Sequence, residues 1–235
     1  MSETKPSLPL RIGLIVEGPT DGIVLRAAIK NLLPDRELVF NTIQPDFSAA
    51  FGGTGEGWSG VYRWCRQASS EGGGSVSGSM VLLNHDVIVI HLDADVAEKT
   101  YQSGRIYDET ATDLPCVKSC PPATATTDAL RMVALKWMRE TKLPAKCVFC
   151  TPSKSIEAWV VKALYPKNTH AQSKGWECHD DPDKQLGQQP KATRISKTKR
   201  DYESRRQEFI NAWPDVRKLD EAERFSQEFL AVFKD

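Results

Sequence analysis

The sequence predicts an α/β fold, with a mostly parallel central sheet flanked by helices and a helical extension at the C-terminus. Two observations predict it. Short apolar runs alternate with segments of helical periodicity as far as Leu164, which is typical of strand–helix units. The runs are almost continuously apolar, as in parallel strands buried on both faces. A chain of 235 residues could form one large domain or two small ones, and the regular alternation favours one.

The composition is that of a globular protein, with 40% hydrophobic and 26% charged residues. No apolar stretch approaches the roughly 20 residues that span a bilayer, and Met1–Leu10 has no apolar core of a secretory signal. We therefore expect a cytoplasmic protein that is not bound to a membrane, with its six cysteines mostly reduced. Lys and Arg number 31, as do Asp and Glu, which excludes a protein that coats nucleic acid by bulk charge.

The first half of the chain contains the first predicted strand–helix unit. Ile12–Val16 is an apolar run that predicts a buried strand, and Gly18 with Pro19 ends it. Apolar residues then recur at helical spacing, so we expect a helix over Asp21–Leu32, capped by Thr20 or Asp21. Further along we expect strands over Leu38–Ile43 and Val87–Leu92, a helix over Val61–Ala68, and glycine-rich loops over Phe51–Gly60 and Ser69–Ser79.

The second half begins with a polar, irregular stretch, Tyr101–Pro122, and an amphipathic helix is expected over Asp128–Thr141. Cys147–Cys150 predicts a short strand, and Pro152 and Ser153 open another helix. Beyond Pro166 the chain becomes polar. We therefore divide it into a main part, residues 1–166, and a C-terminal part, residues 167–235, which packs on the main part and ends in two amphipathic helices (Tyr202–Ala212 and Glu221–Phe233).

Carboxylates follow three of the predicted strands. Glu17 and Asp21 come after the first, Asp93 and Asp95 after the central one, and Glu157 lies in the first turn of the helix after the last. Ligands of open α/β sheets bind at the carboxyl ends of the strands, so these groups should meet at one edge. A divalent cation such as Mg²⁺ would relieve their mutual repulsion. Solvated acidic loops, or a Glu157 that only complements a helix dipole, are the alternatives.

Three segments resemble Toprim domains. Ile12-Gly-Leu-Ile-Val-Glu-Gly-Pro-Thr-Asp21 resembles their opening motif, a strand followed by Glu-Gly and Asp. Val87-Ile-Val-Ile-His-Leu-Asp-Ala-Asp95 resembles their second motif, a strand that ends in Asp-x-Asp. Pro152-Ser-Lys-Ser-Ile-Glu-Ala-Trp159 is similar to a segment of small stand-alone Toprim nucleases related to the overcoming-lysogenization-defect family.

The resemblance implies a Toprim-like catalytic domain in residues 1–166 that cleaves phosphodiester bonds of DNA or RNA with one or two Mg²⁺ or Mn²⁺ ions. It implies that Glu17 is a metal ligand or general base, that Asp21, Asp93 and Asp95 are metal ligands, and that Glu157 binds a second ion. Lys154 would stabilise charge on the phosphate as a catalytic cation. Related nucleases act with an ATPase against phage, and since this chain has no phosphate-binding loop motif, an ATPase partner would act in trans.

Basic residues concentrate in one segment of this neutral chain, between positions 191 and 206. In a nucleic-acid-binding role they would contact phosphates, and the alternative is a solvated linker and helix face. One such segment on a neutral surface also favours a homo-oligomer that completes the substrate channel. The residues are Lys191, Arg194, Lys197, Lys199, Arg200, Arg205 and Arg206.

Two further features have structural alternatives. Cys116 and Cys120 with Cys147 and Cys150 could bind zinc, but residues three apart on a strand point to opposite faces, so free thiols are expected. We expect His91 to face the opposite side of the strand from Asp93, as a core or surface residue rather than a general base.

Other functions remain open besides a nuclease. A phosphatase or nucleotidyl-type transferase could use the Asp-x-Asp pair, and such an enzyme would hydrolyse or transfer small phosphate esters. A non-catalytic metal-binding subunit of an ATPase would bind metal without turnover. The intact set of carboxylates favours the nuclease.

Overall fold

The computed structural model describes residues 8–46, 54–173 and 175–234. The described strands form one sheet in the order β2-β1-β3-β4, and every pair of neighbours is parallel. This confirms the predicted α/β fold. The strands are β1 (Leu10–Ile15), β2 (Leu38–Gln44), β3 (Val87–His91) and β4 (Cys147–Cys150).

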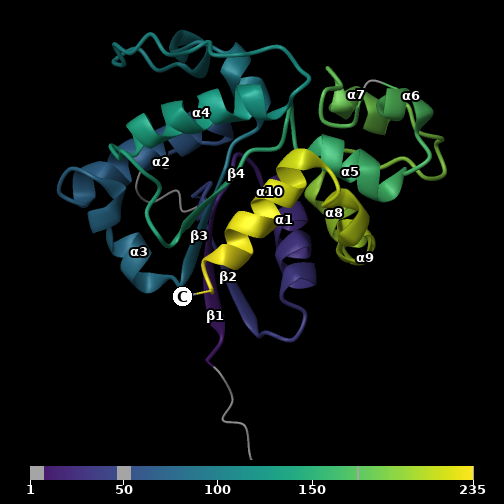
Figure 1. The fold of residues 1–235 in the computed structure, drawn as a ribbon, viewed down its shortest axis with the longest axis horizontal. Helices are drawn as coiled ribbons and strands as arrows, with labels where there is room; N and C mark the ends of the chain where they lie inside the picture. The colour runs from purple at the N-terminus through teal and green to yellow at the C-terminus, as the bar shows by residue number, and fades with distance from the viewer. Residues whose placement is uncertain (1–7, 47–53, 174, 235) are drawn as a thin grey trace, which may run out of the picture.

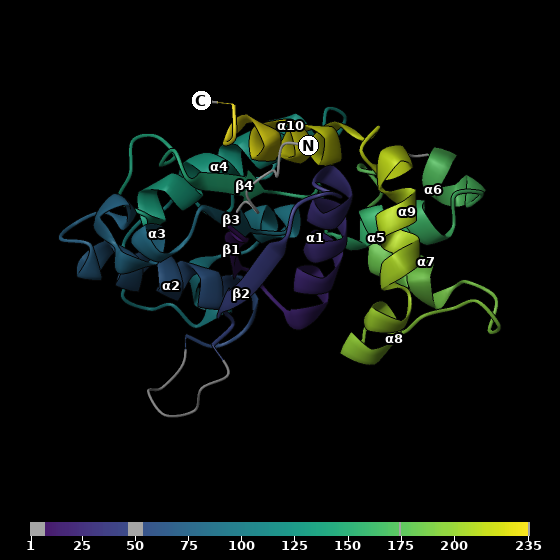
Figure 2. The same cartoon turned by 90° about the horizontal axis from the view of Figure 1, so that it is seen from below.

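Helices cover both faces of the sheet (Figures 1 and 2). On one face, Val87 and Val89 of β3 belong to a core shared with α1 (Pro19–Leu32) and α5 (Glu157–Leu164). On the other, Ile88 and Ile90 pack in a second core with α2 (Gly57–Glu71) and α4 (Thr124–Trp137). Because successive strand residues face opposite sides, a strand covered on both faces must be apolar throughout.

The helix starts differ from the predictions. α1 begins at Pro19, because Gly18 is the residue that precedes the first turn, and the Asp21 carboxylate accepts a hydrogen bond from the Gly18 amide at 2.8 Å. The predicted cap at Thr20 or Asp21 is therefore wrong. α2 starts inside the predicted glycine-rich loop, of which residues 51–53 lie outside the described residues. α4 starts four residues before the predicted helix, and the short α3 (Met80–Asn84) was not predicted.

The C-terminal part is helical and shares the first core. Tyr202, Phe209, Trp213, Phe225 and Phe229 are buried in the same cluster as β1 and α1. Figures 1 and 2 place α8 and α9 beside α1 and α5, and α10 across the β4 side of the sheet. The division at residue 166 remains a prediction. The helices are α6 (Thr169–Ser173), α7 (Pro182–Gly187), α8 (Lys199–Ser204), α9 (Arg206–Val216) and α10 (Asp220–Ala231).

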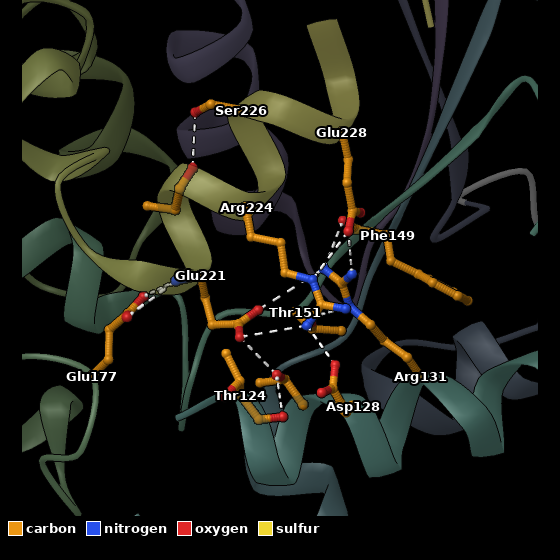
Figure 3. Close-up of polar contacts among 12 residues, drawn as sticks. Thr124, Asp128, Arg131, Phe149, Thr151, Glu177, Glu221, Arg224, Ser226 and Glu228 are labelled. Atoms are coloured by element: carbon orange, nitrogen blue, oxygen red, sulfur yellow. Dashed lines mark hydrogen bonds and ion pairs between the residues drawn. The ribbon is translucent and has the colours of Figure 1, made fainter. Parts of the chain in front are cut away.

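A buried polar network fastens α10 to the sheet (Figure 3). The Arg131 guanidinium of α4 donates hydrogen bonds to the Thr151 hydroxyl at 2.8 Å, just after β4, and to Glu228 of α10 at 2.6 Å. Its third nitrogen lies 3.9 Å from Glu221, whose other oxygen accepts a hydrogen bond from Thr127 at 2.7 Å. This network joins three elements that are far apart in the sequence.

The expectation of free thiols is correct for four of the cysteines and wrong for two. Cys120 and Cys178 form a disulfide, while Cys65, Cys116, Cys147 and Cys150 are free thiols. Among the described helices, none has the length and apolar character needed to cross a membrane.

Candidate functional site

Three segments meet at the carboxyl ends of β1 and β3. The Glu17 carboxylate, which follows β1, accepts a hydrogen bond from the Asp93 amide at 2.8 Å. The Asp93 carboxylate in turn accepts one from the Ile156 amide at 2.9 Å, at the start of α5. Asp93 is buried and Glu17 is half-buried. Direct hydrogen bonds thus join Glu17 to Asp93, 76 positions away, and Asp93 to Ile156, 63 positions away.

His91 lies between two of these acids. Its ring is completely buried, with Nε2 3.2 Å from Asp93 Oδ1 and Nδ1 3.8 Å from Asp21 Oδ2. The expectation that it faces away from Asp93 is wrong, because positions 91 and 93 are two apart and so share one side of an extended chain. The alternation of side chains along an extended chain would have been enough to predict that His91 lies on the same side as Asp93.

Glu157 is buried on the α5 side of the site. Its Oε1 accepts a hydrogen bond from the Tyr202 hydroxyl at 3.1 Å and pairs with the Lys197 ammonium at 2.9 Å. Its Oε2 is buried and has no hydrogen-bond partner within the described part of the chain. An unpaired buried carboxylate oxygen costs free energy unless another group binds it. Lys197 and Tyr202 were not predicted as partners of Glu157.

Burial and neighbouring charges shift the pKa values of four groups of the site: Glu17, Asp21, Glu157 and His91. Burial raises the pKa of Glu17 well above its usual range, and the charge of Asp93 adds to the effect. Burial also raises the pKa of Asp21, against the opposing charge of His91. Burial and then the charge of Asp93 raise the pKa of Glu157 to about 8. Although burial lowers it, the charge of Asp93 and then that of Asp21 raise the pKa of His91 to about 9.

Two of the predicted site residues have other side-chain partners. The Asp95 carboxylate pairs with Lys99 at 3.0 Å. The Lys154 ammonium lies 2.8 Å from Glu98 and 3.6 Å from Asp180. The backbones of Asp95 and Lys154 are joined by a 2.9 Å hydrogen bond, so both lie beside the buried carboxylates while their side chains pair with surface groups.

The predicted basic segment is divided between two environments. Lys197 reaches into the site, where it also lies 3.3 Å from Asp183. Arg205, between the two helices, pairs with Glu208 of α9, and Arg206 of α9 pairs with Glu203 of α8. Four cations of the segment are exposed and form no ion pair with any described residue: Lys191, Arg194, Lys199 and Arg200.

Comparison with known proteins leaves the interpretation of this site to its own geometry. No family model, no curated protein and no solved structure matches the chain. The Toprim resemblance therefore rests on the three sequence segments alone.

The chemistry of the donor set fits Mg²⁺ or Mn²⁺, because carboxylate oxygens are the ligands these ions prefer. Glu17, Asp21 and Asp93 could hold one ion, and the unpartnered Oε2 of Glu157 could contribute to a second. Over residues 8–46, 54–173 and 175–234, no three His, Cys, Asp or Glu side chains form a group that could hold a metal ion as they stand. Mg²⁺ usually keeps several waters and needs only one or two carboxylates, so it does not require such a cage.

The four thiols considered for zinc do not converge. Cys120 is bonded to Cys178, and Cys147 and Cys150 belong to the cores on opposite faces of the sheet.

Proposed function

We propose that the protein is a metal-dependent nuclease that cleaves phosphodiester bonds of DNA or RNA. The observation that carries the proposal is the group of Glu17, Asp21, Asp93 and Glu157 at the carboxyl edge of a parallel sheet, where burial and neighbouring charges raise the pKa values of three of them, Glu17, Asp21 and Glu157. Catalytic groups are often found where such pKa values are perturbed. The Toprim resemblance of the surrounding segments supports the same reaction.

The roles of the side chains follow from their contacts. A bound divalent ion would polarise the phosphate and lower the pKa of a bound water. Glu17, oriented by the Asp93 amide, has a raised pKa and so can accept a proton from the attacking water. His91 lies between Asp21 and Asp93, and its protonated ring offsets their negative charge. Lys197 supplies a positive charge at Glu157, where it would stabilise charge on the substrate phosphate.

The cellular compartment, the partner and the assembly are proposed as the sequence predicts them. We propose a cytoplasmic effector, with an ATPase in trans as an activating partner in antiviral defence and a homo-oligomer as the assembly that completes the substrate channel. Lys191, Arg194, Lys199 and Arg200, as exposed cations, are the members of the basic segment that are available to phosphates.

The test is cleavage of plasmid DNA, single-stranded DNA, total RNA and tRNA in Mg²⁺, Mn²⁺ or EDTA. Glu17→Gln and Asp93→Asn should each lower the metal-dependent rate by at least about a hundredfold, because each removes a charge at the reacting centre. The matched control is Asp86→Asn. Asp86 precedes β3 as Asp93 follows it, and it pairs with Arg11 at the surface, so this variant should cleave at the wild-type rate.

Cleavage that continues unchanged in Glu17→Gln and Asp93→Asn would exclude the nuclease. Metal binding without turnover on any substrate would instead favour the non-catalytic subunit, and a pull-down would then search for the ATPase.

A further inference from the structure

A second group of charged side chains lies outside the acidic site, on α2 and the turn after Tyr101–Gly104. A pocket of about 240 Å³ is lined by Tyr62, Arg63, Arg66, Arg105, Ile106 and Asp108. Three arginines therefore line one cavity of a chain whose net charge is zero.

None of these three arginines forms an ion pair within the described residues. Arg63 is held by neutral groups: it donates to the Thr54 carbonyl at 3.0 Å, to the Ser59 hydroxyl at 3.4 Å and to the Gly104 carbonyl at 3.3 Å. The side chains of Arg66 and Arg105 make no hydrogen bond or ion pair with any described residue. These contacts orient the guanidinium of Arg63 without neutralising it.

Two acids lie nearby and do not cancel this charge. Asp108 lines the pocket but pairs with none of the arginines within 4.0 Å, and Glu109 accepts a hydrogen bond from the Tyr62 hydroxyl at 2.9 Å. The pocket therefore keeps an excess of positive charge. Guanidinium groups match the geometry of phosphate oxygens and bind them through paired hydrogen bonds.

The turn that carries Arg105 also exposes an aromatic ring. Ile106 is buried and its amide donates to the Tyr101 carbonyl at 3.0 Å, which anchors the turn. On either side of it, Arg105 is exposed and Tyr107 is 77% exposed. An exposed aromatic ring beside a phosphate-binding group is the combination that holds single-stranded nucleic acid, since unpaired bases stack on such rings.

The pocket lies within reach of the acidic site. The Gly57 amide, at the start of α2, donates to the Glu17 carbonyl at 2.8 Å. Arg63 and Arg66 follow six and nine residues later on the same helix, or about 9 and 14 Å along its axis. A strand that crosses the acidic site can therefore extend along α2 to this pocket.

We propose that Arg63, Arg66 and Arg105 bind a backbone phosphate of a single-stranded nucleic acid, and that a neighbouring base stacks on Tyr107. The proposal rests on the proposed function for its class of ligand, and it adds a single-stranded substrate and a path for it along α2. This path is separate from the basic segment of residues 191–206.

Binding in EDTA tests this proposal without cleavage. Fluorescence anisotropy would measure the Kd of a labelled 12-nucleotide thymidine strand and of a 12-base-pair duplex. Arg66→Gln with Arg105→Gln should weaken single-strand binding by at least about tenfold and reduce the slope of log K against log salt by about 1.4. Tyr107→Ala should weaken single-strand binding by about tenfold and leave duplex binding unchanged.

The matched control is Lys118→Gln with Lys142→Gln, which removes the same charge from two exposed lysines elsewhere and should change the Kd by less than about twofold. Asp108→Asn should tighten binding, because it removes the carboxylate from the pocket. Thermal unfolding checks that each variant folds, which we expect of Arg66 and Arg105 because their side chains contribute no hydrogen bond.

Equal Kd values for the arginine double variant and the lysine control would overturn the proposal. The proposal would also be overturned if millimolar inorganic phosphate displaced the strand and Tyr107→Ala left the Kd unchanged. Those two results together would assign the pocket to free phosphate. Asp93→Asn keeps these outcomes separate from those of the nuclease: it should lose cleavage, and in its background the arginine double variant should still weaken strand binding by at least about tenfold.

Discussion

Glu177 lies at the start of α10 and is a buried acid that the proposed reaction does not use. Its carboxylate accepts hydrogen bonds from the Trp159 indole at 3.1 Å and from the Glu221 amide at 3.1 Å. Burial nevertheless raises the pKa of Glu177 to about 7, against the effect of these hydrogen bonds. The folded protein therefore binds a proton at Glu177 more tightly than the unfolded chain does, and the free energy of unfolding falls as the pH rises from about 4.5 to about 7.

Glu177→Gln should remove this part of the pH dependence, because the amide keeps an acceptor oxygen and carries no charge. The wild type should lose about 1–3 kcal/mol of stability at this residue between pH 5 and pH 8, and the variant should lose correspondingly less. Urea unfolding at the two pH values measures the difference. The exposed Glu37→Gln serves as the control, and an equal pH dependence in Glu177→Gln and wild type would contradict the prediction.

Individual residues also show how far the sequence could predict the site. Glu17, Asp21, Asp93 and Glu157 could be found because each follows a recognisable strand, and strand ends share an edge of the sheet. The contact of Glu157 with Tyr202 could not, because it joins positions 45 apart through the packing of α8. The sequence also does not show in which direction a side chain points, so the pairing of Lys154 with Glu98 was not predicted.

At the scale of the elements, β4 is held in part by a side chain of α4. It is an edge strand, and Arg131 binds its end through the Phe149 carbonyl at 3.4 Å and the Thr151 hydroxyl at 2.8 Å, while also binding Glu228 of α10 (Figure 3). Glu221 is completely buried beside it. Removing one member of a buried charged network leaves the others without compensation.

Arg131→Met should therefore lower the free energy of unfolding by about 3–5 kcal/mol, measured by urea denaturation. Arg224→Met removes a more exposed arginine from the same network and should cost about 1 kcal/mol. Adding Glu221→Gln and Glu228→Gln to Arg131→Met should recover part of the loss, since the uncompensated charges disappear. If Arg131→Met lowered the free energy of unfolding no more than Arg224→Met does, the network would not be what holds α10.

Elements differ in how well the sequence predicts them. All four strands lie within two residues of their predicted positions, because continuous apolar runs between turn residues have few other interpretations. Helix starts depend on local hydrogen bonds such as that between Asp21 and Gly18, which place α1 two residues early. The short helices α6, α7 and α8 could not be predicted, because they lie in polar sequence whose few apolar residues do not recur at helical spacing.

For the whole molecule, the acidic site makes the free energy of unfolding depend on pH. The raised pKa values of Glu17, Asp21 and Glu157 mean that the folded state holds protons that the unfolded chain releases. The raised pKa of His91 acts in the same direction up to about pH 9. Stability from these groups is therefore greatest at low pH and is lost as the pH rises. A divalent ion would replace the protons.

Mg²⁺ or Mn²⁺ at 10 mM should therefore raise the Tm more at pH 8 than at pH 6, because fewer protons compete for the carboxylates at the higher pH. Differential scanning fluorimetry measures the shift, with K⁺ at equal ionic strength as the control. Asp93→Asn should abolish the pH-dependent part of the shift. A Tm increase that is the same at both pH values, or unchanged in Asp93→Asn, would show that the ion binds elsewhere.

The packing of α9 against α1 has a consequence for synthesis of the protein. The Asn31 side chain of α1 donates to the Ile210 carbonyl of α9 at 2.9 Å, across 179 positions of the chain. Lys197 and Tyr202 likewise reach Glu157 from far along the sequence. At a ribosome speed of about 5–20 residues per second, the strands emerge several seconds before these partners. The nascent chain therefore carries its carboxylates before the residues that enclose them have been made, and the acidic site is completed only after α8 and α9 have been synthesised.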